Sequence, residues 1–160
     1  MNRREIQLII TDFDGVMTDN RVLVDEHGIE SVMVSRADGQ GINMIRKMGI
    51  DVVILSTEKN SVVKRRAEKL NVECINGVND KRKYLEQISK KRNCSLHNIM
   101  YIGNDINDYD ALMIAGIKVV PADAYIEVKK VADYVTHTNG GCGVIREIAG
   151  MIQNCVFTIE

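Results

Sequence analysis

The feature that most constrains the fold is an alternation of two apolar patterns along the chain. Short, continuous runs rich in β-branched residues, without polar alternation, predict parallel strands that are buried on both faces. Segments with helical spacing lie between these runs, and strand and helix in alternation predict a right-handed, open α/β sheet. The expected strands are Ile6–Thr11, Val52–Ser56, Ile99–Ile102 and Ile117–Val120, and the expected helices are Gly41–Met48, Ser61–Leu70, Asp80–Lys91 and Asp108–Ala115.

One segment departs from this alternation. Arg21–Val34 contains two β-rich runs around a turn with Gly28, which predicts a hairpin. Because it follows the first strand directly, we expect it to project from the end of the sheet as a flap, although an ordinary edge hairpin fits the same pattern. Towards the end of the chain we expect a short strand at Asp133–Thr136, a helix at Val144–Met151 and an apolar tail at Cys155–Ile159 that packs on a neighbouring subunit.

Composition excludes several classes of protein. The 160 residues fit one domain, residues 1–160. Lys and Arg number 21 and Asp and Glu 22, and this balance argues against a nucleic-acid partner. No run approaches the ~20 apolar residues of a membrane span, and the apolar run near the N-terminus is too short for a signal peptide. The four cysteines show no C-x-x-C spacing, which favours reduced thiols and a cytoplasmic location.

The end of the first expected strand carries two acids two residues apart, Asp12 and Asp14, followed by Gly15. Ligands of open α/β sheets bind outside the carboxyl ends of the strands, so both carboxylates can face one crevice. Two close carboxylates repel each other, and a divalent cation relieves that repulsion; oxygen ligands favour Mg²⁺. A lone D-x-D pair is common in surface loops, but one that directly follows a buried strand is much more specific.

Other expected strand ends carry complementary groups. The second strand ends at Ser56-Thr57, where a hydroxyl can also serve as a helix N-cap. Lys81 lies in the first turn of a helix, where a cation opposes the helix dipole unless it reaches an anion; a solvated lysine is the alternative. The fourth strand ends in Gly103-Asn104-Asp105-Ile106-Asn107-Asp108, which could otherwise be a solvated acidic loop.

Together these groups predict phosphoryl transfer through an aspartyl-phosphate. One carboxylate is the nucleophile, and a second serves as general acid and then as general base. Mg²⁺ and a lysine neutralise the phosphoryl oxygens. A phospho-accepting receiver domain uses similar residues, but it carries its phospho-acceptor on the third strand. Here Ser56 follows the strand Val52–Leu55, and Asp14 lies two residues beyond Asp12, as a phosphatase needs. The sequence therefore favours a phosphatase over a receiver domain.

The motifs that carry this chemistry resemble those of the haloacid dehalogenase (HAD) superfamily phosphatases along the whole chain. DFDGVMTD resembles the first motif, VVILST the second, Lys81 the third and GNDIND the fourth. The resemblance implies a Rossmann-like fold, with Asp12 as nucleophile, Asp14 as acid and base, and Ser56 and Lys81 on the phosphoryl group. It also implies that Mg²⁺ is held by the Asp12 side chain, the Asp14 backbone carbonyl and the fourth motif.

Within the superfamily, the short hairpin and the absence of a large cap insertion resemble one branch. That branch contains octulosonate 8-phosphate phosphatases, phosphatases of nine-carbon 2-keto sugar acids, and domains attached to acylneuraminate cytidylyltransferases. The segments Ser35–Gly41 and Gly140–Glu147 are similar to this branch's second-site segments. The resemblance implies a homotetramer in which flaps and tails close a neighbour's active site, a possible link to a cytidylyltransferase, and no membrane partner.

Two departures from the family pattern bear on function. Asn104 stands where the family commonly has Asp, so Asn104 and Asp105 are alternative metal ligands, with Asp108 in support. A non-catalytic oligomerisation domain associated with a cytidylyltransferase is therefore an alternative to the enzyme. Thr57-Glu58-Lys59 stands where octulosonate phosphatases tend to have Gly-Arg, which favours a nine-carbon substrate. We expect Thr57, Glu58, Arg66 and Lys69 to bind that substrate, Arg66 and Lys69 through its carboxylate, unless these two belong to a solvated helix face.

Overall fold

The computed structural model describes residues 6–154, so the predicted apolar tail at 155–159 lies outside the described residues. A six-stranded parallel sheet forms the centre, with strand order β5-β4-β1-β6-β7-β8. The predicted α/β fold is confirmed. The strands are β1 (Leu8–Thr11), β4 (Asp51–Leu55), β5 (Glu73–Ile75), β6 (Ile99–Ile102), β7 (Ile117–Val120) and β8 (Tyr134–Val135).

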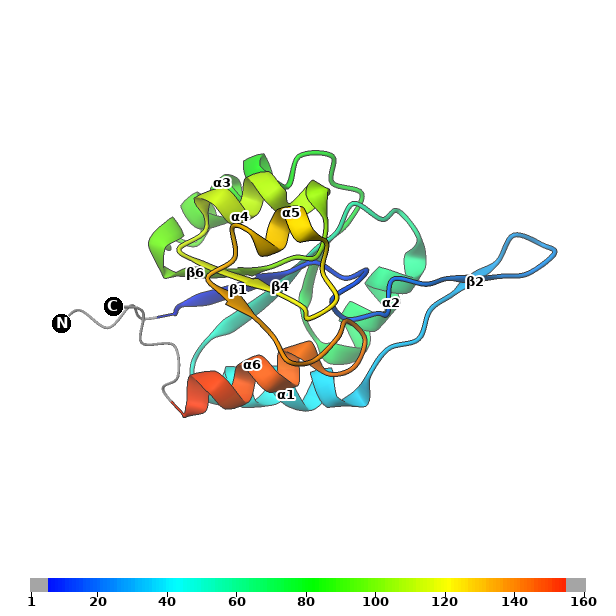
Figure 1. Cartoon of the computed structure of the whole chain (residues 1–160), viewed down its shortest axis with the longest axis horizontal. Helices are drawn as coiled ribbons and strands as arrows, with labels where there is room; N and C mark the ends of the chain where they lie inside the picture. Colours follow the sequence, from blue (N-terminus) through cyan, green and yellow to red (C-terminus); the bar gives the residue numbers. More distant parts are fainter. Residues whose placement is uncertain (1–5, 155–160) are drawn as a thin grey trace.

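Helices cover both faces of this sheet (Figure 1). One face packs against α1 (Arg36–Lys47), α2 (Ser61–Leu70) and α6 (Val144–Gln153). The other packs against α3 (Lys81–Lys91), α4 (Tyr109–Ile114) and α5 (Ile126–Lys129). In β1, Leu8 and Ile10 face one core and Ile9 faces the other, and all four residues of the strand are buried, which explains its continuous apolar run. Short 3₁₀ turns at Leu96–Asn98 and Ile106–Asp108 precede β6 and α4.

Two predicted elements differ from the structure, and two were missed. Helix α1 begins at Arg36 and not at Gly41, because Ser35 caps it by accepting a hydrogen bond from the Ala37 amide. The segment Asp108–Ala115 divides into a 3₁₀ turn and the shorter α4. Strand β5 was missed because it is short and only partly buried at the sheet edge; helix α5 was missed because four residues show no clear period.

The hairpin prediction is confirmed, and the hairpin projects from the sheet as expected (Figure 1). We call residues 21–34 the flap. Its strands β2 (Leu23–Val24) and β3 (Glu30–Ser31) are only two residues long. Its base joins the body through a bridge between Thr18 and Val34. In the described chain, this hairpin is the only insertion between β1 and α1, so the expected absence of a large cap agrees with the structure. That residues 1–160 form one domain stays a prediction.

Candidate active site

The predicted nucleophile lies directly beyond β1, where the sheet continues by one more hydrogen bond from the Asp12 amide to the Ile102 carbonyl (2.8 Å). Asp12 is 3% exposed. Its Oδ1 accepts a hydrogen bond from the Phe13 amide (2.7 Å), and its Oδ2 lies 2.8 Å from Lys81 Nζ. The buried strand therefore places this carboxylate, and Lys81 fixes its orientation.

Lys81 is buried and bridges two strand ends. Its Nζ lies 2.6 Å from Asp108 Oδ1, which also accepts a hydrogen bond from the Tyr101 hydroxyl (2.7 Å). The other oxygen of Asp108, Oδ2, accepts a hydrogen bond from the backbone amide of Asn104 (2.8 Å). Lys81 is therefore not a solvated lysine; it reaches anions as its position in the first helical turn suggested. Asp108 holds both Lys81 and the loop after β6, so we assign it a positioning role.

The electrostatics of this cluster leave negative charge uncompensated. Burial, and after it the charge of Asp108, raises the pKa of Asp12 to about 8, although Lys81 opposes both effects. Burial and the nearby Glu58 also raise the pKa of Asp14. One lysine thus faces three carboxylates, and a divalent cation would offset the remaining charge.

A pocket of about 270 Å³ opens beside Asp12. Five carboxylates line it, and neither lysine nor arginine does. Asp14, Thr57 and Glu58, which the sequence proposes for the site, line this pocket, and so do both candidate metal ligands of the fourth motif, Asn104 and Asp105. The lining residues are Asp12, Phe13, Asp14, Asn20, Val22, Glu30, Val32, Thr57, Glu58, Asn60, Val62, Val63, Asn104, Asp105 and Asn107.

The two candidate ligands of the fourth motif are held differently. Asn104 is 5% exposed and packs against Gly15, whose φ is +79°. A Cβ at Gly15 would lie 2.0 Å from Asn104 Nδ2, so this close approach requires glycine. Asp105 instead uses its Oδ1 to accept the Ile106 amide (2.6 Å) and caps the following 3₁₀ turn. Asn104 is therefore the better candidate.

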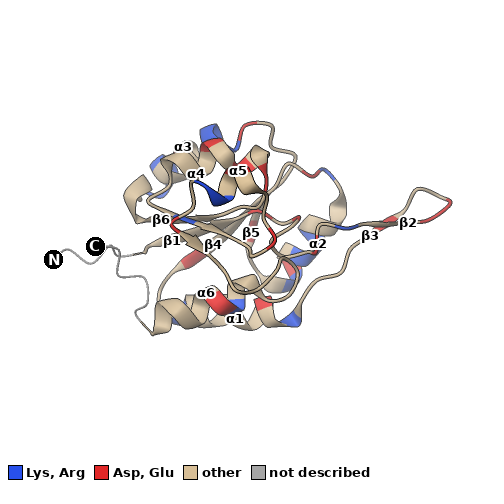
Figure 2. Cartoon of the chain, in the orientation of Figure 1, with Lys and Arg blue, Asp and Glu red and all other residues tan. Residues whose placement is uncertain are grey.

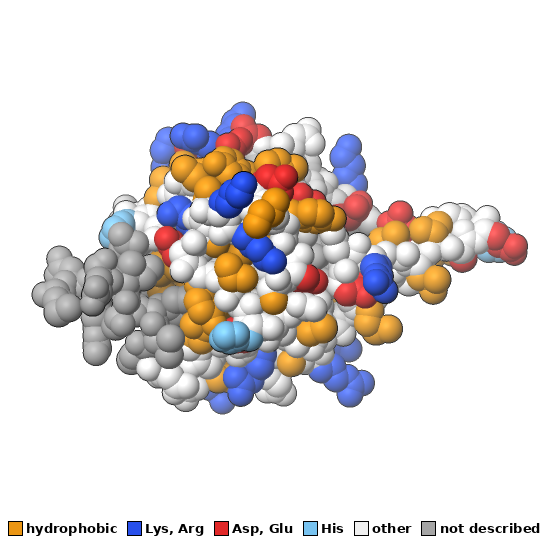
Figure 3. Space-filling view, in the orientation of Figure 1, with side chains coloured by type: hydrophobic (Ala, Val, Ile, Leu, Met, Phe, Trp, Pro, Cys, Tyr) orange, Lys and Arg blue, Asp and Glu red, His pale blue; other side chains and the backbone are white. Residues whose placement is uncertain are grey.

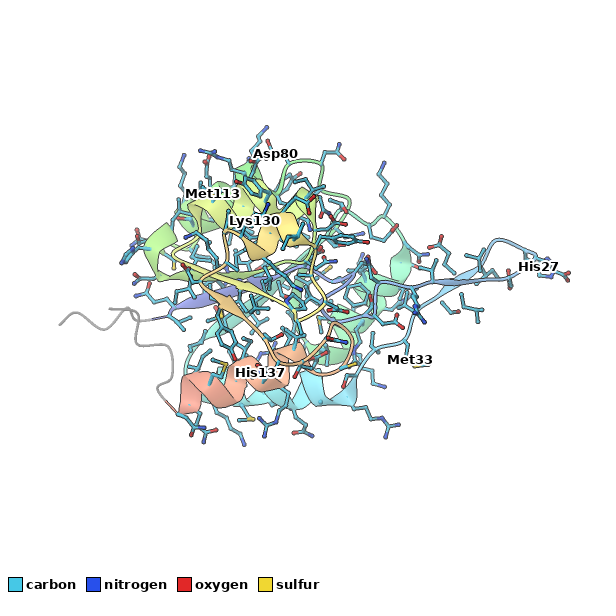
Figure 4. All side chains as sticks on the ribbon, viewed as in Figure 1. His27, Met33, Asp80, Met113, Lys130 and His137 are labelled. Atoms are coloured by element: carbon cyan, nitrogen blue, oxygen red, sulfur yellow. The ribbon has the colours of Figure 1, made fainter. Side chains whose placement is uncertain are left out.

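Mg²⁺ suits this donor set. Residues 6–154 hold no group of three or more His, Cys, Asp or Glu side chains arranged around one metal position. The Asp12 carboxylate, the Asp14 backbone carbonyl and the Asn104 amide oxygen are nevertheless appropriate donors for Mg²⁺, which keeps several waters and shares substrate phosphate oxygens. The histidines are scattered: His27 lies at the flap tip and His137 beside α6 (Figure 4).

Ser56 is buried directly beyond β4, and its Oγ accepts the Glu58 amide (3.1 Å). It therefore shapes the turn that brings Thr57 and Glu58 to the pocket. It does not cap α2; that position belongs to Asn60, whose Oδ1 accepts the Val62 amide (3.0 Å).

Arg66 and Lys69 do not reach the pocket beside Asp12. They lie in a separate groove of about 540 Å³ between α1 and α2, together with Arg36. Arg66 donates a hydrogen bond to the Ser35 carbonyl (3.0 Å). Figure 2 shows the Lys and Arg residues that gather along α2. Within one subunit, the structure therefore separates these two predicted substrate residues from Thr57 and Glu58.

The segments Ser35–Gly41 and Gly140–Glu147 pack next to the site and do not form its pocket. Asp38, in the first turn of α1, accepts the Ile145 amide at the start of α6 (3.0 Å). Gly140 and Gly141 pack against the loop after β1, where a Cβ at Gly140 would lie 2.2 Å from the Gly15 carbonyl. Gly140 and Gly141 thus support the loop after β1, and neither segment lines the pocket beside Asp12.

Sequence reasoning missed three polar residues of the pocket, Asn20, Glu30 and Asn60, and it named Asn107 only as part of the fourth motif. Asn20 adopts a left-handed conformation (φ 63°), which its position in a loop did not reveal. Asn60 carried a usable signal, because an asparagine just before a helical segment is a favoured N-cap.

The comparisons with known proteins agree with this geometry. The model of the haloacid dehalogenase-like hydrolases matches residues 54–148. The chain therefore belongs to the haloacid dehalogenase-like hydrolases, and its predicted class, a phosphatase, and its predicted cofactor, Mg²⁺, are confirmed at the level of this family. No helix within residues 6–154 combines the length and the apolar character needed to cross a membrane.

Two curated relatives indicate which members of this family the chain is similar to. The 3-deoxy-D-manno-octulosonate 8-phosphate phosphatase KdsC of Haemophilus influenzae is 33% identical over 148 residues, covering 92% of this chain and 82% of the relative. The N-acylneuraminate cytidylyltransferase of Oncorhynchus mykiss is 29% identical over 148 residues, covering 90% of this chain; the chain spans only 34% of that relative's length.

Solved structures show the same likeness. A HAD family hydrolase from Streptomyces avermitilis has a TM-score of 0.90 and 41% identity, with 94% of this chain and 86% of that one covered. The 3-deoxy-D-manno-octulosonate 8-phosphate phosphatase of Moraxella catarrhalis, solved with magnesium, phosphate and KDO, has a TM-score of 0.89 and 30% identity. There, 93% of this chain and 86% of the other are covered.

Proposed function

We propose that this chain removes the terminal phosphate of a 2-keto-3-deoxy sugar acid phosphate, with a nine-carbon nonulosonate 9-phosphate preferred over an octulosonate 8-phosphate. One observation carries the proposal: the buried Asp12 carboxylate is paired with Lys81 and lines a pocket that Asp14 also lines. Glu58 in that pocket supports the nine-carbon substrate, because octulosonate phosphatases tend to have Gly-Arg at this segment.

In the proposed reaction, an Asp12 oxygen attacks phosphorus while the bond from phosphorus to the sugar oxygen breaks. Asp14 gives a proton to the departing sugar oxygen. It then takes a proton from the water that attacks the aspartyl-phosphate, which releases phosphate and restores the Asp12 carboxylate. Lys81 and Ser56 orient the phosphoryl group. Mg²⁺, held by Asp12, Asp14 and Asn104, would neutralise the phosphoryl oxygens.

Arg66 and Lys69 fit this proposal only if another copy of the chain contributes them, because their groove is separate from the pocket. We therefore infer a homotetramer in which one subunit's groove faces another's pocket. The flap supports this assembly: Val22, Leu23, Val24, Ile29 and Met33 are all more than half exposed (Figure 3). A cytoplasmic location stays a prediction.

The test is phosphate release from a panel, with Mg²⁺ and with EDTA. The panel is 2-keto-3-deoxynononate 9-phosphate, N-acetylneuraminate 9-phosphate, 3-deoxyoctulosonate 8-phosphate and p-nitrophenyl phosphate. We expect Mg²⁺-dependent turnover that is lost in Asp12→Asn and is fastest with a nine-carbon substrate. If the folded protein turns over none of these substrates, the proposed phosphatase function is rejected.

Arg66→Ala separately tests whether Arg66 binds the carboxylate of the sugar acid substrate. It should raise KM for the sugar acid phosphate more than KM for p-nitrophenyl phosphate, which has no carboxylate. The matched control is Arg65→Ala on the same helix, whose side chain is exposed and pairs with Glu68. Equal effects of Arg66→Ala on both substrates would remove Arg66 from the substrate site.

A second candidate function is a non-catalytic oligomerisation domain linked to a cytidylyltransferase. Asn104 supports it, because an amide supplies no negative charge for the metal, and so does the similarity to one third of the Oncorhynchus mykiss cytidylyltransferase. Calorimetry with Mg²⁺ separates the two candidates: the scaffold should neither bind Mg²⁺ nor turn over the panel, yet should assemble as a tetramer.

A further inference from the structure

The flap contacts the body of the protein through one well-defined side-chain hydrogen bond. Asn60 Nδ2 donates to Glu30 Oε2 (3.0 Å), and both residues are partly buried. Among the described residues, no other flap side chain has a hydrogen bond to a residue outside the flap. The flap has two paired residues in each strand, too few for a hairpin to be stable alone. Its position at the pocket therefore depends on its contacts with the body: this hydrogen bond, the bridge at its base and the packing of Val32 and Val34 against the core.

The helix cap determines which way the Asn60 amide points. Asn60 Oδ1 accepts the Val62 amide and so caps α2, which leaves Nδ2 directed at the flap. The backbone amide of Asn60 donates to Glu58 Oε1 (2.8 Å), so the same loop also orients Glu58. The donor is thus oriented by the cap of α2, independently of the flap.

The hydrogen bond joins two walls of the pocket. Val22, Glu30 and Val32 of the flap line one side, and Glu58, Asn60 and Val62 line the other. Phosphate has to bind deep in the pocket at Asp12, so the remainder of the substrate has to extend outward between these walls. The bond therefore fixes where the flap wall stands relative to the wall formed by residues 58–62, and so shapes the part of the pocket that the sugar chain would occupy.

We propose that Glu30 and Asn60 form a latch that fixes the flap against α2 and thereby determines selectivity for the extended sugar acid chain. Both are positioning residues. This inference rests on the proposed function, because it deepens the choice of substrate at the same site.

Exchanging the donor and the acceptor tests the latch. Asn60→Asp keeps a good N-cap for α2 but removes the donor and sets two carboxylates against each other. We expect the ratio of kcat/KM for the nine-carbon substrate to kcat/KM for p-nitrophenyl phosphate to fall about tenfold, the effect of losing one hydrogen bond to a charged group. Combining it with Glu30→Gln places a new amide donor opposite the new carboxylate, and we expect the ratio to recover to within about threefold of wild type.

Hydrogen exchange of the amides of residues 21–34 gives a second readout that does not need turnover. Exchange should be faster in Asn60→Asp and should return to the wild-type rate in the double variant. Glu26→Gln, which removes an exposed charge at the flap tip, is the matched control and should change neither readout. An unchanged ratio and unchanged exchange in Asn60→Asp would overturn the latch. Absence of turnover by wild type on every substrate would reject the proposed function instead, and exchange would still test the latch.

Discussion

The end of β1 and the flap follow each other directly in the sequence, but different forces hold them. Asp12 lies among buried partners, with Lys81 and Asp108 fixed by contacts of 2.8 Å or less. The flap has exposed apolar side chains and one side-chain hydrogen bond to the body. Under the proposed function, this contrast assigns two tasks to different regions: the sheet end orients the reacting groups, and the flap contacts the rest of the substrate and neighbouring subunits.

The largest expected effect follows from removing the cation at the sheet end. Lys81→Met would leave the Asp108 carboxylate buried without its cation and Asp12 without its partner, so we expect the free energy of unfolding at pH 7 to fall by about 3–5 kcal/mol. Urea denaturation measures this. Lys83→Met, in the same first turn of α3 but exposed, should stay within about 0.5 kcal/mol of wild type. Equal stability of the two variants would show that Lys81 does not hold the site together.

The next effect tests the support behind the catalytic loop. Burial raises the pKa of Asp38 to about 6 from a usual 3.8, despite the Ile145 and Arg146 amides and Arg66. Because the folded state binds this proton more tightly, Asp38 contributes stability that is present below about pH 4 and is lost as pH rises through 6. The shift corresponds to at most about 3 kcal/mol.

Asp38→Asn keeps an oxygen acceptor and cannot ionise. Its free energy of unfolding, relative to wild type, should therefore increase between pH 4 and pH 7. Denaturation at these two pH values measures the change, and Asp110→Asn, at an exposed acid of α4, provides the baseline. If the free energy of unfolding changes equally in Asp38→Asn and in wild type between pH 4 and pH 7, the raised pKa of Asp38 is contradicted.

A smaller effect concerns the metal. Asn104→Asp adds a negative ligand, so we expect half-maximal phosphatase activity at about tenfold lower Mg²⁺ concentration. Titration of activity with Mg²⁺ is the measurement. Asp105→Asn tests whether Asp105 is the metal ligand instead. If it is, Asp105→Asn should raise the Mg²⁺ concentration needed for half-maximal activity, and Asn104→Asp should leave that concentration unchanged.

The same contrast explains how far the sequence alone was informative. The buried strands were predictable because parallel strands covered on both faces leave continuous apolar runs, and Asp12, Asp14 and Lys81 follow from what stands at the strand ends. The separation of Arg66 from the pocket was not predictable, because helical spacing places residues on a face without saying which element packs against it. The contact of Glu30 with Asn60 joins residues thirty positions apart, and local patterns carry no information about such pairs.

The smallest expected effect on stability is that of Leu23→Ala on the flap, and its reference is a buried leucine of the body, Leu85. Leu85 is fully buried against the sheet, and Leu23 is 74% exposed on the flap. Leu85→Ala should lower the free energy of unfolding by about 2–5 kcal/mol, because it leaves a cavity. Leu23→Ala should change it by less than about 0.5 kcal/mol. If the flap covers a neighbouring subunit, however, Leu23→Ala should lower the molar mass measured by light scattering, whereas Leu85→Ala should not do so while it remains folded. A tetramer that persists in Leu23→Ala, and in Met33→Ala as a second test, would remove the flap from the subunit interface and would leave its exposed side chains without an assembly role.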